Sequence, residues 1–415
     1  MAIPGVTTLI KDRFYSVSRQ DSPIGPRVVA IAKRSTADNT GGIPDLDVYR
    51  ATNEADVITA FGNGSDIHRA FVELVTAGAE RLFLVPLPSN TVFAHNTGTL
   101  TSGGSDVFAA AFAAAEAAIP DIIVPWGRGG HPLDWQSPAT PGDDPEFGFH
   151  ADNTTTITSN WAYKVASAVK DISQNTNPCV AVMGIKPYLS TTEKMTPSQI
   201  AAHLALPGLP DRNAGTLFKD VGPYVTIVAA ELKPTNYNST GATPSNFGYS
   251  NGAAFLAATM SRLPSFSSIV NKSIYNVEAL RYAPTRTQQD TLGGKGINSV
   301  VINFNKIPVF GEGVTFAQST SDYTRLSTKR IIDEAALVVR QVCQKFVGEP
   351  SNIQVRNAME TAITSALRGM QIVGALLASD FAVTYIPNQN KAIVDLVLTP
   401  AFELKSIEIQ ISINI

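Results

Sequence analysis

The last nine residues of the chain alternate strictly between isoleucine and a polar residue. Period-two alternation of a β-branched residue is typical of a β-strand with one buried face. Such a strand needs a hydrogen-bonding partner and a core for its apolar face, because a free strand of this kind aggregates. We therefore predict that it pairs with a sheet, in its own domain or in a neighbouring molecule. The isoleucines are Ile407, Ile409, Ile411, Ile413 and Ile415.

Upstream, short apolar runs alternate with helical patterns as far as residue 310. This alternation predicts βαβ units around a mainly parallel sheet. The expected strands lie at 28–32, 81–86, 121–125, 179–183 and 224–230. The expected helices lie at 66–75, 108–118, 161–172, 197–206 and 253–260. Asp66 is the expected N-cap of the first helix and Thr196 that of the fourth, and the Gly/Pro-rich residues 127–157 are expected to form a loop.

The pattern changes after residue 310. Apolar residues recur at three- and four-residue spacing over 325–346 and again over 359–373, which predicts two long amphipathic helices. Strand-like runs at 381–386 and 393–398 follow and predict an antiparallel pair. The second domain is therefore expected to be an α+β module.

These patterns divide the chain into four expected parts. They are an extended N-terminal arm (1–20), an α/β domain (21–310), an α+β domain (311–403) and a C-terminal β-strand arm (404–415). The α+β domain already has two strands, and Pro400 interrupts the path to the last strand. We therefore expect the sheet that accepts the closing strand to belong to another subunit.

Composition favours a surface used for protein contacts. Only 16% of the residues are charged, against about 25% in typical domains. The net charge of −3 and the lack of a Lys/Arg cluster argue against nucleic-acid binding. No apolar run approaches ~18 residues and no signal-peptide pattern is visible, so we expect assembly in a reducing cytoplasm without membrane insertion. Cys179 and Cys343 are expected to be buried free thiols.

One motif resembles a catalytic site. Residues 248–252 fit the G-x-S-x-G pattern, with Ser250 as the nucleophile. A nucleophile elbow needs a strand before the serine and a histidine after it. Here a polar loop precedes Ser250 and all five histidines lie upstream. A helix start capped by Ser250 or Asn251 is the preferred interpretation.

Two other patterns have some of the residues of a ligand site. Acidic residues and histidines between His131 and His150 could be imagined as a metal site, but no ligand spacing repeats, and a solvated loop is expected. Lys295 lies among glycines but lacks the Ser or Thr and the spacing of a phosphate-binding loop. We therefore expect no cofactor and no enzyme activity.

A series of short motifs runs in order through residues 248–415. They are the small-residue helix start at 250–254, Tyr282-Ala-Pro284, the leucine and Gly-Ile-Asn of 292–298, Gly374-Ala-Leu376, and the closing Glu-x-Ile-x-Ile strand. In this order they resemble the contractile tail sheath proteins of phages (the myophage tail sheath family) and of related injection systems. The opening at residues 3–6 is also similar to that family. Members usually carry an Arg and a Trp or Lys around 262–270 and a Trp near the turn at Phe310; this chain has Arg262 but no Trp in either place.

The resemblance implies a fold and a mechanical function. The implied fold is a subtilisin-like α/β domain, a C-terminal domain of two helices and an antiparallel sheet, and extended terminal β-arms. Sheath subunits stack as hexameric rings around the tail tube and contract to drive it through the host envelope. The implied partners are copies of the same chain, the tail tube protein, and baseplate and tail terminator proteins. The implied location is the virion tail, after assembly in the host cytoplasm.

The resemblance also implies which residues make contacts. Strand exchange between subunits would use the five isoleucines together with Val6, Leu9 and Ile10 of the N-terminal arm. Arg325, Lys329 and Arg330 would face the tube, with solvated helix-end charges as the alternative. Two other functions stay open: a serine hydrolase that uses Ser250, and a static shell or capsid-like protein.

Overall fold

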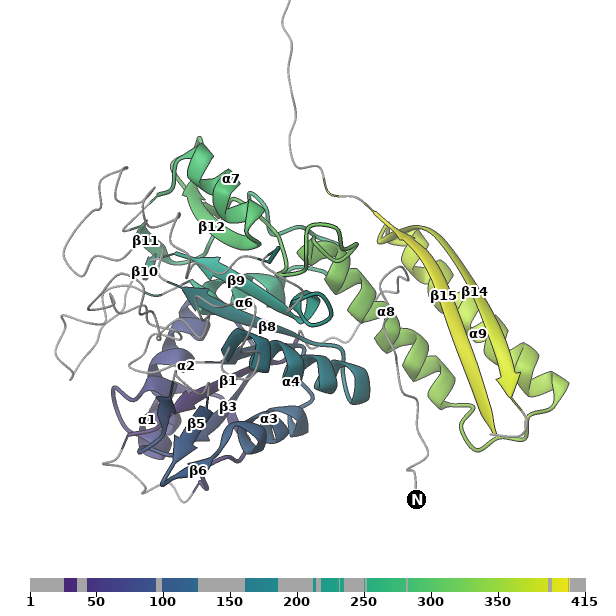
Figure 1. The fold of residues 1–415 in the computed structure, drawn as a ribbon, viewed down its shortest axis with the longest axis horizontal. Helices are drawn as coiled ribbons and strands as arrows, with labels where there is room; N and C mark the ends of the chain where they lie inside the picture. Colours follow the sequence, from purple (N-terminus) through teal and green to yellow (C-terminus); the bar gives the residue numbers. More distant parts are fainter. Residues whose placement is uncertain are drawn as a thin grey trace, which may run out of the picture.

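The computed structural model describes residues 26–35, 43–94, 99–125, 161–185, 212–213, 218–230, 232–234, 250, 252–280, 283–386, 390–401 and 403. Both terminal arms, the expected loop at 127–157 and the expected helix at 197–206 lie outside these ranges. The described residues form a large α/β part and a small α+β part (Figure 1).

An eight-stranded sheet forms the centre of the large part, in the order β13-β12-β9-β8-β7-β1-β3-β2. The six inner strands are parallel, and the edge strands β2 and β13 run antiparallel to their neighbours. The strands are β1 (Val28–Lys33), β2 (Tyr49–Ala51), β3 (Leu82–Leu87), β7 (Ile122–Pro125), β8 (Val180–Ile185), β9 (Val225–Ala229), β12 (Ile297–Ile302) and β13 (Pro308–Phe310). All five predicted strands are confirmed.

Helices cover both faces of this sheet, so the inner strands are mostly apolar, with Thr226 in β9 and Asn298 in β12 among the buried polar exceptions. Successive strand residues point to opposite sides: Val28 and Val29 belong to two different core clusters. One face packs against α1 (Glu54–Phe61), α2 (Asp66–Thr76) and α6 (Ala253–Arg262). The other packs against α3 (Phe108–Ala117), α4 (Trp161–Asn175) and the 3-10 turn η3 (Gly222–Tyr224).

Smaller elements lie around the edges of the large part. A three-stranded sheet contains β4 (Val92–Ala94), β5 (Thr99–Ser102) and β6 (Ser105–Asp106), and a two-stranded sheet contains β10 (Leu232–Pro234) and β11 (Val277–Leu280). Helix α7 (Arg286–Gly294) leads into β12.

The predicted N-cap of α2, Asp66, is wrong by one residue. Ser65 is the N-cap: its backbone is extended, and its hydroxyl accepts a hydrogen bond from the His68 N–H at 3.2 Å. Asp66 is instead the first helical residue. Its partial burial raises the pKa of its carboxyl to about 6.

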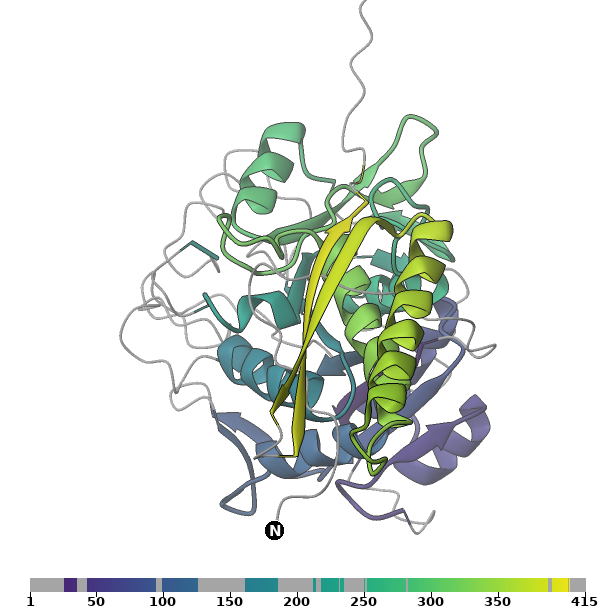
Figure 2. The same ribbon diagram turned by 90° about the vertical axis from the view of Figure 1, so that its right-hand side faces the viewer.

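The small part consists of two long helices and a hairpin. They are α8 (Leu326–Gln344), α9 (Ile353–Ile372), β14 (Leu376–Ile386) and β15 (Lys391–Pro400). Both predicted helices and both predicted strands are confirmed, although α9 begins six residues before the expected start. Gly374 (φ 78°) ends α9 and turns the chain into β14. Figure 2 shows α9 alongside the hairpin, with α8 behind it.

Helix α8 belongs to both parts. Leu326, in its first turn, packs in the core of the large part, whereas Ile331, Ala335 and Val339 pack in the core of the small part. The two parts are therefore joined by a continuous helix. Together they confirm the α/β plus α+β class, and the subtilisin-like detail and the domain boundaries remain predictions. None of the helices that the structure describes has the length and apolar character needed to cross a bilayer.

Candidate assembly interface

Among the residues that the structure describes, both edges of the hairpin in the small part are open. Strands β14 and β15 pair with each other from Leu376–Pro400 to Ile386–Lys391, and within the described residues neither pairs with a third strand. Each outer edge therefore presents a row of N–H and C=O groups without a ladder partner, which is a template for strand addition. A two-stranded sheet is also marginal by itself. This hairpin can accept a strand on either side.

The two faces of the hairpin differ. Phe381, Val383 and Leu396 are partly buried on the core of α8 and α9. On the other face, Leu377 is 63% exposed and Val397 is 52% exposed. An added strand would therefore extend a sheet with two different faces. One face packs on the core of α8 and α9, and the other exposes isolated apolar side chains that can take part in further packing.

The chain leaving β15 is held to the start of α8. The Ala401 N–H donates to the Ala375 carbonyl at 3.0 Å. The Ser327 hydroxyl donates to Glu403 Oε2 at 3.0 Å, and Arg325 Nη1 lies 3.3 Å from Glu403 Oε1. Glu403 is the last residue before the predicted arm at 404–415. These contacts therefore anchor the residue that precedes the arm to the start of α8.

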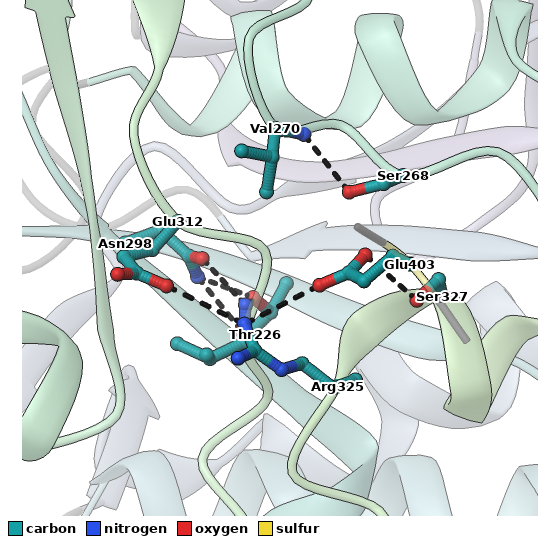
Figure 3. Close-up of polar contacts among 9 residues, drawn as sticks. Thr226, Ser268, Val270, Asn298, Glu312, Arg325, Ser327 and Glu403 are labelled. Carbon is teal, nitrogen blue, oxygen red and sulfur yellow. Dashed lines mark hydrogen bonds and ion pairs between the residues drawn. The ribbon is translucent and has the colours of Figure 1, made fainter. Parts of the chain in front are cut away.

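Arg325 lies between two carboxylates (Figure 3). Its Nη1 is 3.5 Å from Glu312 Oε2 as well as 3.3 Å from Glu403. Glu312 is only 5% exposed, and this guanidinium helps to compensate its charge. Arg325 therefore ties the end of the hairpin to the loop of the large part that carries Glu312.

Asn298 holds that loop in place. Its side-chain N–H groups donate to the Val314 carbonyl at 2.8 Å, the Ile227 carbonyl at 2.9 Å and the Thr226 hydroxyl at 2.9 Å. Its side-chain oxygen accepts from the Val314 N–H at 2.8 Å. The hydroxyl of Thr226 also donates to the Val314 carbonyl (Figure 3). The asparagine of the Gly-Ile-Asn motif therefore fixes the approach to α8.

Two of the three expected tube-facing cations are engaged inside the chain. Lys329 has no exposed surface; it pairs with Asp333, and its Nζ lies 4.4 Å from the centroid of the Tyr224 ring. Arg330 donates to the carbonyls of Met260 (2.8 Å) and Leu263 (2.7 Å). Burial lowers the pKa of its guanidinium to about 10.

Arg325 is the most exposed of the three, at 32% of its side chain. Tube contact stays a prediction for all three, and for Lys329 it would require the start of α8 to leave its present packing. The ion pair between Lys329 and Asp333 could have been predicted from the sequence. Asp333 follows Lys329 by four residues, which places both side chains on the same face of the helix.

Ser250 lies in a buried cluster rather than at an open site. It forms a β-bridge with Leu232 and is 1% exposed. Its hydroxyl donates to Glu73, which also pairs with Arg69 at 2.8 Å. Burial raises the pKa of Glu73.

This geometry gives no support to a nucleophile. The one histidine within the described ranges, His68, faces Gly64 and Glu54 instead of Ser250. The expected side-chain cap of α6 is also wrong, since the N-cap is Gly252 at φ 84°. Its backbone cannot take a side chain easily, because a Cβ there would lie 2.9 Å from that of Ala230.

Both cysteines, and some of the residues that could bind a metal, lie within the described ranges. Cys179 and Cys343 are free and buried, as predicted, and burial raises the pKa of both thiols, that of Cys343 to about 11. Among the residues with described positions, no three His, Cys, Asp or Glu side chains are grouped to hold a metal. The acidic loop at 131–150 lies outside those residues, as do all the predicted strand-exchange residues of the two arms.

Comparison with known proteins identifies relatives by structure alone. No protein-family model and no curated protein sequence matches the chain. The fold matches a chain of the contracted sheath complex of the extracellular injection system PVC, at 12% identity and a TM-score of 0.61, covering 100% of this chain and 98% of that one. It matches the contracted helical sheath of the anti-feeding prophage at 14% identity and a TM-score of 0.59, with both chains covered completely.

A crystal structure of the sheath tail protein Lin1278 from Listeria innocua also matches, at 11% identity and a TM-score of 0.56. The match covers 94% of this chain and 93% of that one. At these identities the likeness concerns the fold. From the sheet to the hairpin, the chain has the fold of contractile sheath proteins.

Proposed function

We propose that the protein is a structural subunit of a contractile tail sheath. The observation that carries this proposal is the hairpin with two open edges, in a chain whose whole length matches sheath proteins. In this proposal, subunits stack as hexameric rings around a tail tube, and the arms at 1–20 and 404–415 add strands to the hairpins of neighbours. Contraction then drives the tube through the host envelope.

Strand addition explains how subunits would stay linked during a large motion. The backbone hydrogen bonds between an added arm and the edge of a hairpin would persist when the rest of each subunit rotates. The isoleucine face adds about 1.5–3 kcal/mol for each fully buried side chain, or on the order of 10 kcal/mol for five before the cost of ordering the arm. A one-residue slip would turn every isoleucine outward, so the register is well specified.

The serine hydrolase alternative has no observation in its favour. A substrate could reach Ser250 only through a buried cluster, and its partner Glu73 is 1% exposed. A static shell differs from a sheath in the particles it would form. Negative-stain microscopy separates them, because a sheath gives hollow cylinders of two lengths and a shell gives closed particles.

Deletion of residues 406–415 tests the proposal. We expect soluble folded monomer and no polymer, because the strand that joins neighbours is missing. A matched control replaces the polar positions Gln410 and Ser412 by threonine, which keeps the isoleucine face and should still polymerise. Long cylinders formed by the truncated protein would contradict the proposal.

A further inference from the structure

A groove of about 1000 Å³ lies between the two parts of the molecule. Helices α8 and α9 form one wall, and the end of α6 with the residues that follow it forms the other. The starts of β7 and β8 line the floor, and Pro26, where the described chain begins, lines the groove too.

Helix α9 presents a strip of small side chains to this groove. Ala362, Ser365, Ala366 and Gly369 lie along it, and Ile372 continues the strip with 78% of its surface exposed. A Cβ added to Gly369 would meet no atom within 4 Å. The strip therefore leaves room for another backbone to approach the helix closely.

The rest of the lining holds hydrogen-bond donors without acceptors. Arg330 Nη1, Arg262 Nε and Ser265 Oγ are buried and have no partner among the described residues, and Ser265 is only 8% exposed. A buried polar group without a partner destabilises the folded state, so a ligand that supplies the missing acceptors is favoured. Asp121, Asp333 and Glu334 also line the groove and disfavour an anionic ligand. Uncharged acceptors, such as peptide carbonyls, fit these donors best.

The described part of the chain begins at this groove, with Pro26. The Arg27 N–H donates to Asp121 Oδ2 at 2.7 Å, and the Arg27 guanidinium donates to the Ala118 carbonyl at 3.0 Å. These contacts fix the residue that follows Pro26. Eight extended residues reach about 26–29 Å, whereas the α9 strip from 362 to 373 is about 17 Å long. The eight residues before Pro26 can therefore cover the whole strip.

We propose that residues 18–25 of the same chain lie in this groove in extended conformation. Their carbonyls accept hydrogen bonds from Arg330, Arg262 and Ser265, and Ile24 packs on the apolar part of the wall. Pro23 and Gly25 suit this role, because a polyproline-like backbone has no internal hydrogen bonds and keeps its carbonyls free. Only residues 1–17 then remain to reach another subunit. The proposal does not depend on the sheath function, because it concerns a single chain.

Limited trypsin digestion of the full-length monomer fraction tests this placement. Arg19 lies in the proposed segment and Arg13 lies before it. After normalisation to a synthetic peptide of residues 1–30, we expect cleavage after Arg19 to be at least about tenfold slower than cleavage after Arg13. Equal normalised rates would overturn the proposal.

A pair of variants connects that protection to the groove. Ala366→Phe fills the strip and should abolish the protection of Arg19. Thr364→Phe places the same ring on an exposed α9 position that does not line the groove, and should leave the protection unchanged. Circular dichroism confirms that both variants fold. Protection that persists in Ala366→Phe would count against the proposal.

Crosslinking identifies the occupant even if Ala366→Phe does not fold. Cysteines at Ser22 and Ser365 are joined with a short bismaleimide, and Thr364→Cys replaces Ser365→Cys in the control. A crosslinked peptide pair within one chain supports the proposal. A crosslinked dimer would assign the groove to a second copy and overturn it, as would the absence of any crosslink.

Discussion

At the scale of single residues, several side chains have structural duties that their sequence context does not reveal. Asn298 lies in a short glycine-flanked motif, yet it makes four hydrogen bonds that hold the loop before α8. Ser250 fits a catalytic motif, yet its hydroxyl supports Glu73, 177 positions away in the sequence. A local sequence motif suggests which kind of role a residue could have. Its hydrogen-bond partners, which lie far away in the sequence, are known only from the fold.

Loss of Arg325 should destabilise the protein. Arg325→Gln removes the ion pairs of Arg325 with the buried Glu312 and with Glu403, so we expect a loss of about 1–3 kcal/mol in the free energy of unfolding. Urea denaturation at pH 7 measures it. Arg286→Gln, at an exposed position of α7, is the matched control and should change the free energy by less than about 0.5 kcal/mol. Equal effects of the two substitutions would contradict the role of Arg325.

Asp66 should make stability depend on pH. The folded-state pKa of about 6 lies above the ordinary aspartate pKa of 3.8, so the folded state holds the proton more tightly and loses stability as pH rises from about 4 to 6. Asp66→Asn should therefore stabilise the protein by about 1–2 kcal/mol at pH 7 relative to its effect at pH 4. Unfolding measured at both pH values checks this. An equal effect of Asp66→Asn at pH 4 and at pH 7 would contradict this account.

At the scale of elements, the strongest sequence patterns gave the correct structure. The buried strands are continuous apolar runs, and α8 and α9 have clear apolar faces, so their positions follow from periodicity. The apolar patterns do not predict strand β12 or helix α7, because Asn298 and Ser299 interrupt the apolar run of β12 and Leu292 is the one large apolar residue of α7. The open edges of the hairpin could not be predicted, since pairing depends on what the rest of the chain leaves uncovered.

Gly252 should be the critical residue for the start of α6. Gly252→Ala places a Cβ at positive φ and 2.9 Å from that of Ala230, so we expect a loss of more than about 1 kcal/mol. Gly294→Ala is the control, because a Cβ there meets nothing within 4 Å. It should be neutral or slightly stabilising. Thermal unfolding of both variants makes the comparison, and a larger cost at Gly294 would contradict this account.

At the scale of the whole molecule, α8 joins the two cores. Its first turn lies in the core of the large part, and its middle lies in that of the small part. Lys329 and Arg330 add contacts from α8 to η3 and to the end of α6. We therefore expect the two parts to unfold together.

A cavity in the small part tests this coupling. Ile363→Ala should cost about 2–5 kcal/mol and lower the stability of both parts, with one transition in urea. Hydrogen exchange in β8 and α9 reports on the parts separately. Ile353→Ala, at a position 65% exposed and outside the groove, is the control and should change little. Destabilisation of α9 without any change in β8 would show that the parts unfold independently.

Helix α8 also determines how the molecule would carry a mechanical load. Its 19 residues extend over about 28 Å without a break. A pull applied to a strand bound at the hairpin edge would reach the central sheet along the axis of this helix, through hydrogen bonds aligned with the force. Under tension the chain would therefore behave as one stiff body, and stretching between the hairpin and β1 should give a single rupture event.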